Sequence, residues 1–523
     1  MKHTFHSSFA GLIAIGLLAA GAQPNAMAEV RLPAIFSDHM VLQQDSAVPV
    51  WGWAEPGEEI TVSIAGQTKT TKANAAGKWS LKLDKLKAGD TLTLTVTGKN
   101  TLTVQDVLVG EVWLCSGQSN MGMTVSSSKD FEQEKAAANY PQLRMFKEGD
   151  GASPTPQEEG KGAWLICTPE NVGGFSASAY FFGREIHKVL NQPVGLINSS
   201  VGGTTIEAWT SWEAQKDIAD LKPVFERWDK MQAGWDPAKA TAQYEQQMAQ
   251  FKANSAKAKA AGKAAPRAPR KPSEPRLESN HPANLFNGKI MPLLPYSIHG
   301  AIWYQGESNA GNGSQYALQL ATMIKDWRAR WGYDFPFIWV QLPDFRKAQT
   351  APVEDTGWVR VRDGMLKTLS LPNTGMAVTL GLGEPDNIHP KNKQEVGRRL
   401  AQWALAKVYQ QKGIVASGPL PSGHEIRGNE IIVSFNYTDG GLAAKAGALK
   451  GFAIAGEDKK WVTATARIDG DKIIVSSPEV PKPAAVRYAW AENPEFNLYN
   501  GAGLPATPFR TDDWPQAVPE AKK

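Results

Sequence analysis

The chain has 523 residues, with 56 Lys and Arg side chains against 52 Asp and Glu side chains, and a formal net charge of +4. So small a charge on so long a chain argues against a nucleic acid partner, because phosphate binding needs a concentrated basic surface. The length and the hydrophobic share of 42% are sufficient for two or three domains with well-filled cores.

The first 28 residues have the three parts of a secretory signal peptide. Met1, Lys2 and His3 form a basic start, residues 9–22 are apolar, and Ala28 closes an Ala-Met-Ala cleavage site. The apolar run is too short for a membrane span, and no later run approaches twenty apolar residues. We therefore expect removal of residues 1–28 and a periplasmic or secreted mature protein without a membrane span.

Residues 29–105 alternate between apolar and polar side chains with a period of two. The alternating runs lie at residues 47–53, 59–64, 78–83 and 91–96. Gly-containing turns separate these runs, which predicts a small antiparallel β-sandwich. The same pattern returns after residue 417, so residues 418–523 are predicted to form a second β-sandwich-like domain.

Between these two domains, residues 106–417 contain short apolar runs that end in Gly-rich turns and lead into helical patterns. The runs lie at residues 107–115, 194–197, 300–304, 335–342 and 376–382. This alternation predicts an α/β domain with a parallel sheet. Residues 211–276 interrupt it with an insertion whose second half is rich in Ala, Lys and Pro. We interpret the insertion as a surface helical excursion that ends in a solvated loop, with a basic docking patch as the alternative.

Polar residues follow four of the predicted parallel strands. In chain order they are Ser119, Gly202, Gly203, Gln305, Asn309, Asp386 and His389. Because the carboxyl ends of parallel strands meet at one edge of a sheet, where ligands bind, we expect these residues to lie close together.

The residue types at this edge suit acyl transfer. A serine hydroxyl needs a base to take its proton, and imidazole, with a pKa of about 6.5, can do so near neutrality. We therefore predict Ser119 as the nucleophile, His389 as the general base and acid, and Asp386 as the carboxylate that orients the imidazole. Each residue taken alone has an ordinary alternative as a helix cap or turn residue, so the prediction depends on their occurrence together.

The tetrahedral oxyanion of such a reaction needs preorganised hydrogen-bond donors. The predicted donors are the backbone amides of Ser119, Gly202 and Gly203 and the side-chain amides of Gln305 and Asn309. Gln305 is the preferred side-chain donor. The residues predicted to support the site are Gln118, Asn120 and Glu307. We expect Glu307 to brace the serine loop, and its alternative role is to replace Asp386 as the partner of the histidine.

The chain contains only two cysteines, Cys115 and Cys167. An exported chain can oxidise such a pair to a disulfide, and two buried free thiols are the equal alternative. No pair of histidines beyond residue 28 has the spacing of a metal site, so we expect no metal site.

Four sequence blocks carry a resemblance to a known family. They are Gly117-Gln118-Ser119-Asn120-Met121, Gly202-Gly203-Thr204, the stretch from Trp303 to Asn309, and Asp386 with His389 and Pro390. Together they resemble the SGNH-type carbohydrate esterases, specifically the sialate O-acetylesterases, and the likeness runs from about Leu32 to near the C-terminus. The resemblance implies a flavodoxin-like hydrolase core, a Ser119, His389 and Asp386 triad, no metal or cofactor, and removal of acetyl groups from the hydroxyls of sialic acids.

The sequence thus predicts an exported serine esterase that acts on an O-acetylated sugar, with a sialic acid as the first choice. An acetylxylan-type or other polysaccharide deacetylase would use the same residues and differ only in the sugar. A noncatalytic carbohydrate-binding protein is the alternative from another class, because two β domains and 18 tryptophans offer surfaces for sugar stacking. The occurrence of Ser119, Gln305 and the Asp386 to His389 turn in one chain argues against it.

Overall fold

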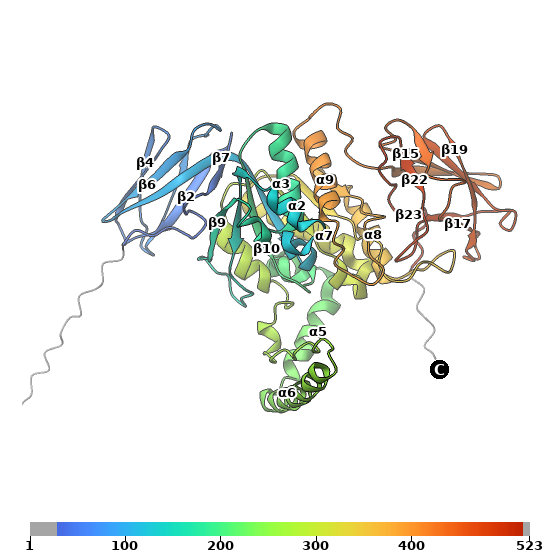
Figure 1. Ribbon diagram of the computed structural model, residues 1–523, viewed down its shortest axis with the longest axis horizontal. Coiled ribbons are helices and arrows are strands. Elements are labelled where there is room, and N and C mark those ends of the chain that lie inside the picture. Colours follow the sequence, from blue (N-terminus) through green and yellow to red (C-terminus); the bar gives the residue numbers. More distant parts are fainter. Residues whose placement is uncertain (1–28, 516–523) are drawn as a thin grey trace, which may run out of the picture.

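The computed structural model describes residues 29–515, so the predicted signal peptide lies outside the described residues. Figure 1 shows three parts side by side along the long axis, a β-rich N-terminal part, a central α/β part and a β-rich C-terminal part. Two helices of the central part, α5 (Lys222–Ala233) and α6 (Pro237–Ala260), project away from this row. No helix within residues 29–515 is both long and apolar enough to cross a membrane.

The N-terminal part consists of short strands, most of them antiparallel, and buried and more exposed side chains alternate along several of them. The strands are β1 (Val41–Gln43), β2 (Val48–Trp53), β3 (Glu59–Ile64), β4 (Gln67–Lys72), β5 (Lys78–Leu83) and β6 (Leu92–Thr97). β2 pairs with β5, while β4, β3 and β6 form an antiparallel sheet that continues into β7 (Thr101–Gly117). The period-two pattern of the sequence therefore corresponds to real strands with one buried face.

Strand β7 joins the N-terminal part to the central part without a break. Its first half pairs with β6, and its second half lies between β10 (Val194–Ser200) and β11 (Gly300–Tyr304). Where the strand passes between the two sheets, Asp106 has a left-handed φ of 54° and binds Arg144 at 2.9 Å. The boundary expected between residues 105 and 106 thus falls inside a strand, and one apolar core extends through both parts.

The central sheet has the order β13-β12-β11-β7-β10-β8-β9 and is parallel except for β9. The remaining strands are β8 (Tyr140–Glu148), β9 (Gly162–Cys167), β12 (Phe337–Val340) and β13 (Thr374–Ala377). Counted along the chain over β7, β10, β11, β12 and β13, the spatial order is 2-1-3-4-5, that of a doubly wound α/β sheet. The strand order reverses beside β7, so the carboxyl end of β7 is the expected ligand edge.

Helices cover both faces of the central sheet. On one face, Trp113 of β7 packs against Phe182 of α3 (Ala177–Leu190), which in turn packs against α9 (Lys393–Trp403). On the other face, Trp303 of β11 packs against Trp327 of α7 (Tyr316–Trp331), which contacts α8 (Gly357–Thr368). The short helices are α1 (Ser119–Gly122), α2 (Phe131–Ala136) and α4 (Trp212–Gln215). These strand tryptophans are core residues and are not available for sugar stacking.

Both cysteines are buried and free, so of the two alternatives the chain has buried thiols and no disulfide. Burial raises the pKa of the Cys115 thiol well above its usual value and that of Cys167 to about 12. A buried thiol of high pKa is a poor nucleophile. Cys115, four residues before Ser119, is therefore a packing residue.

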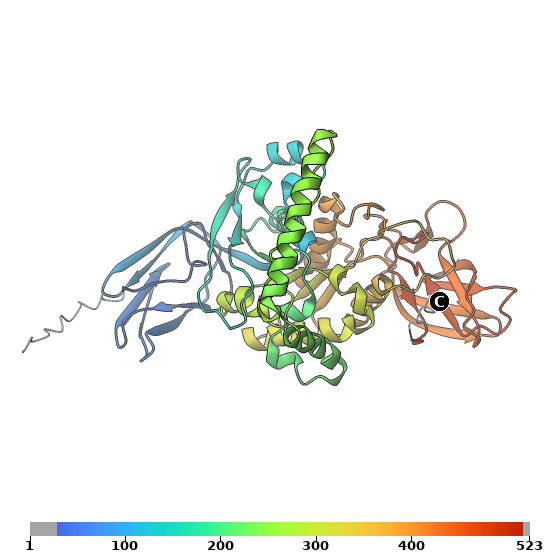
Figure 2. The same ribbon diagram turned by 90° about the horizontal axis from the view of Figure 1, so that it is seen from below.

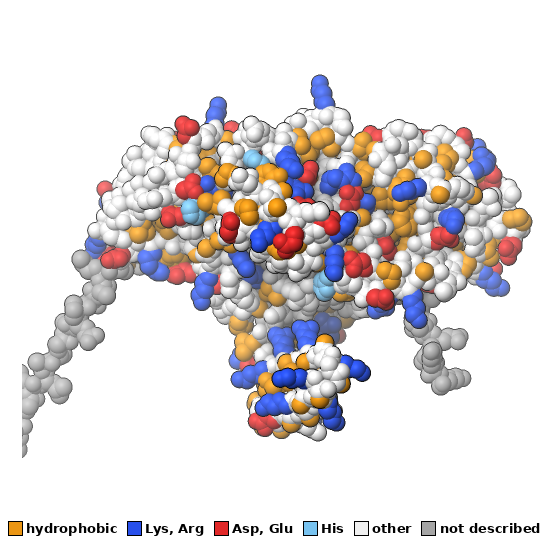
Figure 3. Space-filling model, in the orientation of Figure 1, with side chains coloured by type: hydrophobic (Ala, Val, Ile, Leu, Met, Phe, Trp, Pro, Cys, Tyr) orange, Lys and Arg blue, Asp and Glu red, His pale blue; other side chains and the backbone are white. Residues whose placement is uncertain are grey.

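The insertion forms α4, α5 and α6. Helix α6 begins after Asp236, whose carboxylate accepts hydrogen bonds from the Ala238 and Lys239 amides at 3.0 Å. None of the 24 residues of α6 is buried, and Figure 2 shows the helix lying across the outside of the central part. Lys and Arg side chains are frequent on this projecting part in Figure 3. The exposed stretch 261–274 that follows has neither helix nor strand.

The C-terminal part has a core of its own. Its sheets are β14-β15-β20-β19 and β18-β17-β21-β23, with β16 paired to β22. The strands are β14 (Leu420–Arg427), β15 (Glu430–Asn436), β16 (Leu442–Ala444), β17 (Phe452–Ala455), β18 (Val462–Thr463), β19 (Thr465–Asp469), β20 (Lys472–Ser476), β21 (Ala485–Tyr488), β22 (Leu498–Asn500) and β23 (Phe509–Arg510). Between the sheets lies an apolar cluster separate from that of the other two parts, which makes this part a distinct packing unit.

Candidate active site

The carboxyl end of β7 makes a tight turn that positions Ser119. Gly117 has a φ of 140°, and a Cβ at this position would lie 2.2 Å from the Tyr304 carbonyl oxygen, so a side chain has no room. The Gln118 amide donates to the same carbonyl at 2.9 Å, and α1 begins at Ser119. The Ser119 amide makes no hydrogen bond within residues 29–515, as is usual at the start of a helix. The turn therefore offers the hydroxyl and the amide of Ser119 together.

His389 lies next to Ser119, with its Nε2 atom 2.8 Å from the serine Oγ. The pKa of His389 is lowered, first by burial of the imidazole and second by the positive charge of Lys393. A histidine with a lowered pKa is neutral near pH 7. The imidazole is thus ready to accept the hydroxyl proton at Nε2.

The loop that carries His389 is held by side-chain hydrogen bonds to its backbone. Asn387 Oδ1 accepts from the His389 amide at 3.0 Å, and Asn387 Nδ2 donates to the His389 carbonyl at 2.9 Å. Glu384 in turn accepts from Asn387 Nδ2 at 2.9 Å. Asn120 Nδ2 donates to the Ile388 carbonyl at 3.0 Å and so ties this loop to the serine turn.

Asp386 does not bind the imidazole in this structure. The residue is exposed, and among the described residues its carboxylate makes no hydrogen bond or ion pair. Nδ1 of His389 likewise has no hydrogen-bond partner within residues 29–515. Glu307 is not the partner of His389 Nδ1 either, because its carboxylate accepts a hydrogen bond from Asn120 Nδ2 at 2.6 Å. The expected Asp386 to His389 hydrogen bond is therefore absent from this conformation.

Gly202 and Gly203 follow β10 and approach the serine turn closely. A Cβ at Gly202 would lie 3.3 Å from Ser119 Cβ, so the missing side chain permits this approach. Gly203 has a φ of 72°, a conformation that favours glycine. Within the described part of the chain, neither glycine amide donates a hydrogen bond. The Ser119 and Gly202 amides are therefore unengaged donors of two residues that lie against each other.

Gln305 and Asn309 have no free amide hydrogen, which differs from the sequence expectation. Gln305 Nε2 donates to the Thr204 carbonyl at 3.0 Å and to Asn309 Oδ1 at 2.7 Å. Asn309 Nδ2 donates to Glu207 Oε2 at 2.9 Å, and its Oδ1 also accepts from the Ile206 amide at 3.0 Å. Both side chains are buried and hold the segment after β10 in place. Their arrangement fits a bracing role, because their hydrogens already have acceptors.

The predicted supporting residues join the serine turn to the segment after β11. Gln118 Oε1 accepts from the Ser308 amide at 3.3 Å, and both Gln118 and Asn120 are buried. Asn120 Oδ1 accepts a 2.6 Å hydrogen bond from Nζ of Lys393, the first residue of α9. We name Asn120, Glu307 and Lys393 the lysine cluster.

Burial shifts both ionisable groups of the lysine cluster toward neutrality. The pKa of Lys393 is lowered to about 7 by burial, against the opposing charges of Glu307 and Glu384. The pKa of Glu307 is raised by burial, which outweighs the hydrogen bond from Asn120. Reasoning from the sequence missed Lys393, although it stands four residues after His389. The sequence offered little signal for it, because a lysine near a helix start usually has a solvated side chain.

The arrangement is chemically suited to acyl transfer. It brings a serine hydroxyl against an imidazole nitrogen and leaves the backbone amides of Ser119 and of the adjoining Gly202 unengaged. No group of three or more His, Cys, Asp or Glu side chains within residues 29–515 is arranged to hold a metal ion.

Comparisons with known proteins agree on one kind of protein. Residues 109–261 and 287–406 match the family model of carbohydrate esterases described as sialic acid-specific acetylesterases. A sialate O-acetylesterase of Mus musculus is 30% identical over 92% of this chain and 94% of its own length. That of Homo sapiens is 29% identical over 92% of each chain. The crystal structure of a carbohydrate acetylesterase from Xanthomonas citri superposes with a TM-score of 0.78, at 37% identity, and covers 93% of this chain and 100% of that chain.

Proposed function

Because this chain belongs to the sialic acid-specific acetylesterase family of carbohydrate esterases and is a carboxylic ester hydrolase, we propose that it removes O-acetyl groups from sialic acids by serine catalysis. The proposal includes an SGNH-type, flavodoxin-like core, in keeping with the 2-1-3-4-5 strand order. It also includes export to the periplasm or beyond the cell, directed by residues 1–28. The noncatalytic alternative is set aside, since the family is one of esterases.

The observation that carries the proposal is the 2.8 Å separation between Ser119 Oγ and His389 Nε2. In the proposed reaction, Ser119 Oγ attacks the acetyl carbonyl carbon while His389 takes the hydroxyl proton. The amides of Ser119 and Gly202, with that of Gly203, donate to the oxyanion that forms. His389 then gives its proton to the sugar oxygen as the carbon–oxygen bond breaks, which releases the sugar and leaves an acetyl-enzyme. Water, deprotonated by His389, hydrolyses this ester and frees acetate and Ser119.

We assign the orienting role to Asp386, although it is exposed and unbonded. It lies three residues before His389 in a loop that Asn387 and Glu384 hold in shape. Catalytic hydrogen bonds are often loose without substrate and tighten in the complex. A side-chain rotation of Asp386 toward Nδ1 would fix the tautomer and stabilise the imidazolium.

One observation favours a second candidate, which is deacetylation of a polysaccharide such as an acetylated xylan. The structure with 37% identity to this chain is described as a carbohydrate acetylesterase without mention of sialic acid. The residues that perform the chemistry would be the same, and only the sugar would differ.

Acetate release from a panel of substrates tests the proposal. The panel contains O-acetylated sialosides, acetylated xylan and p-nitrophenyl acetate, and the variants are Ser119→Ala and the exposed control Ser127→Ala. We expect hydrolysis of the sialosides at the highest kcat/KM, a loss of about 10⁴-fold or more in kcat for Ser119→Ala, and no change for Ser127→Ala. Activity of folded Ser119→Ala within tenfold of the parent would contradict the serine mechanism. Preference for acetylated xylan would select the second candidate.

A further inference from the structure

A cavity of about 540 Å³ opens at the base of the helical insertion, outside the group of residues assigned to the chemistry. Its lining comes from three segments that are distant in the sequence: the loop between β8 and β9, helix α4, and residues 276–287. The lining includes four side chains that can contact a ligand through an aromatic ring or a polar group, namely Trp212, Arg276, His281 and Asn287.

The cavity is connected to the serine site through Asn280. Asn280 Nδ2 donates to the Gly203 carbonyl at 3.1 Å, and Asn280 Oδ1 accepts from the Thr205 amide at 2.8 Å. The next residue, His281, already lines the cavity. Because Gly202 lies against Ser119, the segment that offers amides to an acetyl group is hydrogen-bonded to the residue that directly precedes the cavity lining. A ligand attached to that acetyl group would therefore extend toward this space.

Trp212 gives the cavity a rigid aromatic surface. Its indole is 39% exposed and lies parallel to the His281 ring, with an interplanar angle of 3° and centroids 6.1 Å apart. Phe225 meets the indole edge-on at 5.0 Å. The backbone of α4 is fixed as well, because the N-cap Ser211 binds the buried Asp326 through its amide and its hydroxyl, each at 2.8 Å. Such an exposed, immobilised indole suits the apolar face of a sugar ring at little entropic cost.

The polar groups of the cavity suit hydroxyls and a carboxylate. The Asn287 side-chain amide makes no hydrogen bond with any described residue, although it lines the cavity. Arg276 is the one Lys or Arg among the lining residues that the structure describes, and no Asp or Glu is among them. Its Nε atom pairs with Glu274 at 2.8 Å, and the guanidinium remains largely exposed. The lining itself thus offers neutral and cationic donors and no carboxylate, and the carboxylate nearest to Arg276, that of Glu274, is already paired with its Nε atom.

We propose that this cavity is the subsite for the sugar that carries the ester, an inference that rests on the proposed esterase function. The pyranose ring packs on Trp212, its hydroxyls bind Asn287, and the carboxylate of an acidic sugar binds Arg276. The helical insertion therefore sets substrate choice, while the residues at the sheet edge perform the chemistry.

The test compares a substrate that has a sugar with one that has none. Trp212→Ala is measured on an O-acetylated sialoside and on p-nitrophenyl acetate, beside the control Met231→Ala, an exposed apolar residue of the same insertion that does not line the cavity. We expect KM for the sialoside to rise about tenfold or more in Trp212→Ala, with p-nitrophenyl acetate turnover and the control unchanged. Trp212→Phe, which keeps an aromatic ring, should recover most of the sialoside affinity.

Arg276→Gln sharpens the test, because it should raise KM for the acidic sialoside and leave a neutral acetylated sugar unaffected. Equal losses on both substrates in Trp212→Ala and Trp212→Phe, or no loss on either, would overturn the subsite. Failure of the esterase function is separate, since it would appear as absent p-nitrophenyl acetate hydrolysis in the parent enzyme.

Discussion

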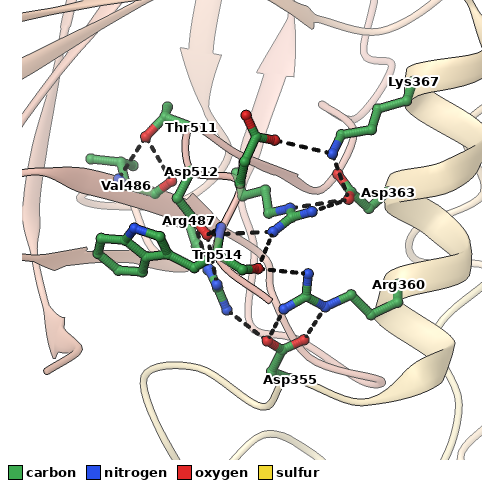
Figure 4. Close-up of polar contacts among 11 residues, drawn as sticks. Asp355, Arg360, Asp363, Lys367, Val486, Arg487, Thr511, Asp512 and Trp514 are labelled. Carbon is green, nitrogen blue, oxygen red and sulfur yellow. Dashed lines mark hydrogen bonds and ion pairs between the residues drawn. The ribbon is translucent and has the colours of Figure 1, made fainter. Parts of the chain in front are cut away.

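Two buried polar clusters of this molecule differ in how completely their charges are paired. One joins the C-terminal part to α8, and we name it the docking cluster; it contains Asp355, Arg360, Asp363, Arg487, Arg510 and Asp512 (Figure 4). The other is the lysine cluster behind the serine and histidine. Both are buried, yet they respond to burial in opposite ways.

In the docking cluster, oppositely charged groups meet in close, mostly two-pronged contacts. Arg487 binds both oxygens of Asp512, at 2.9 and 2.8 Å, and reaches Asp355 at 3.1 Å. Arg510 binds Asp363 at 2.8 Å. Burial alone would raise the pKa of Asp512, but the hydrogen bonds and charge of Arg487 outweigh it and the pKa is lowered. Full pairing keeps the ions charged and fixes one part of the molecule against the other.

In the lysine cluster, the ammonium and the carboxylate do not meet each other. Lys393 Nζ donates to the neutral amide of Asn120, and Glu307 Oε2 has no hydrogen-bond partner among the described residues. Burial is then the stronger influence, and the pKa of Lys393 is lowered to about 7. The comparison indicates that incomplete pairing marks a candidate functional cluster, since it leaves Lys393 with a pKa of about 7, in the pH range in which the proposed histidine base would act.

Apart from the loss of Ser119 itself, the largest effect on catalysis is expected at Asp386, the exposed carboxylate three residues before His389. Asp386→Asn should lower kcat by about 10²-fold, because the imidazolium loses its orienting charge while solvent screens part of the loss. The rate of acetate release by Asp386→Asn and by the parent gives the change in kcat, and circular dichroism confirms that the variant is folded. Glu307→Gln is the competing variant. Should Asp386→Asn be nearly silent while folded Glu307→Gln is inactive, the orienting role belongs to the lysine cluster.

The sequence was sufficient for those parts of the site that depend on strand ends. Ser119 and Gly202 follow apolar runs that become the neighbouring strands β7 and β10, so their proximity follows from topology. His389 follows β13 at the edge of the same sheet, and a longer loop carries it back to the serine. The roles of Gln305 and Asn309 did not follow, because their amides bind groups about a hundred residues away in the chain. Which acceptor a side-chain amide meets is a tertiary property with no local pattern.

Other features of the structure also lack a local signal in the sequence. The domain division at residue 105 lies where the sequence texture changes, and the single strand β7 that runs through this position has no signal of its own in that change. Lys393 is 0% exposed, and no local pattern distinguishes a lysine buried by distant residues from one in solvent. Burial of charge is set by packing from several elements, here α1, β11 and α9.

A smaller effect should follow from Lys393→Met. Its charge lowers the pKa of His389, so its removal should raise that pKa and move the acid limb of kcat/KM to higher pH. Loss of the bond to Asn120 should also reduce kcat about tenfold at all pH values, because the serine turn is held less firmly. The exposed Lys391→Met is the matched control and should leave the profile unchanged. An unmoved acid limb in Lys393→Met would contradict the electrostatic role.

The smallest effect on catalysis is expected in the docking cluster, where Asp512→Asn should leave kcat/KM within about twofold of the parent. Its effect on stability should be large, roughly 3 kcal/mol, because Arg487 and Arg510 lose a buried counter-ion. The folded-state pKa of Asp512 is lowered, so its contribution is present above its usual pKa of about 4 and is lost as the pH falls through the folded-state value.

Urea unfolding of the parent, Asp512→Asn and the exposed neighbour Asp513→Asn tests both statements. At pH 7 only Asp512→Asn should have a lower urea midpoint of unfolding than the parent. The difference between the two midpoints should shrink as the pH is lowered below 4. If instead Asp512→Asn lost activity in step with Lys393→Met while its unfolding was unchanged, full pairing would not distinguish a structural cluster from a catalytic one. The contrast between the two clusters therefore depends on Asp512→Asn, which should lower the stability of the fold and leave the catalytic rate nearly unchanged.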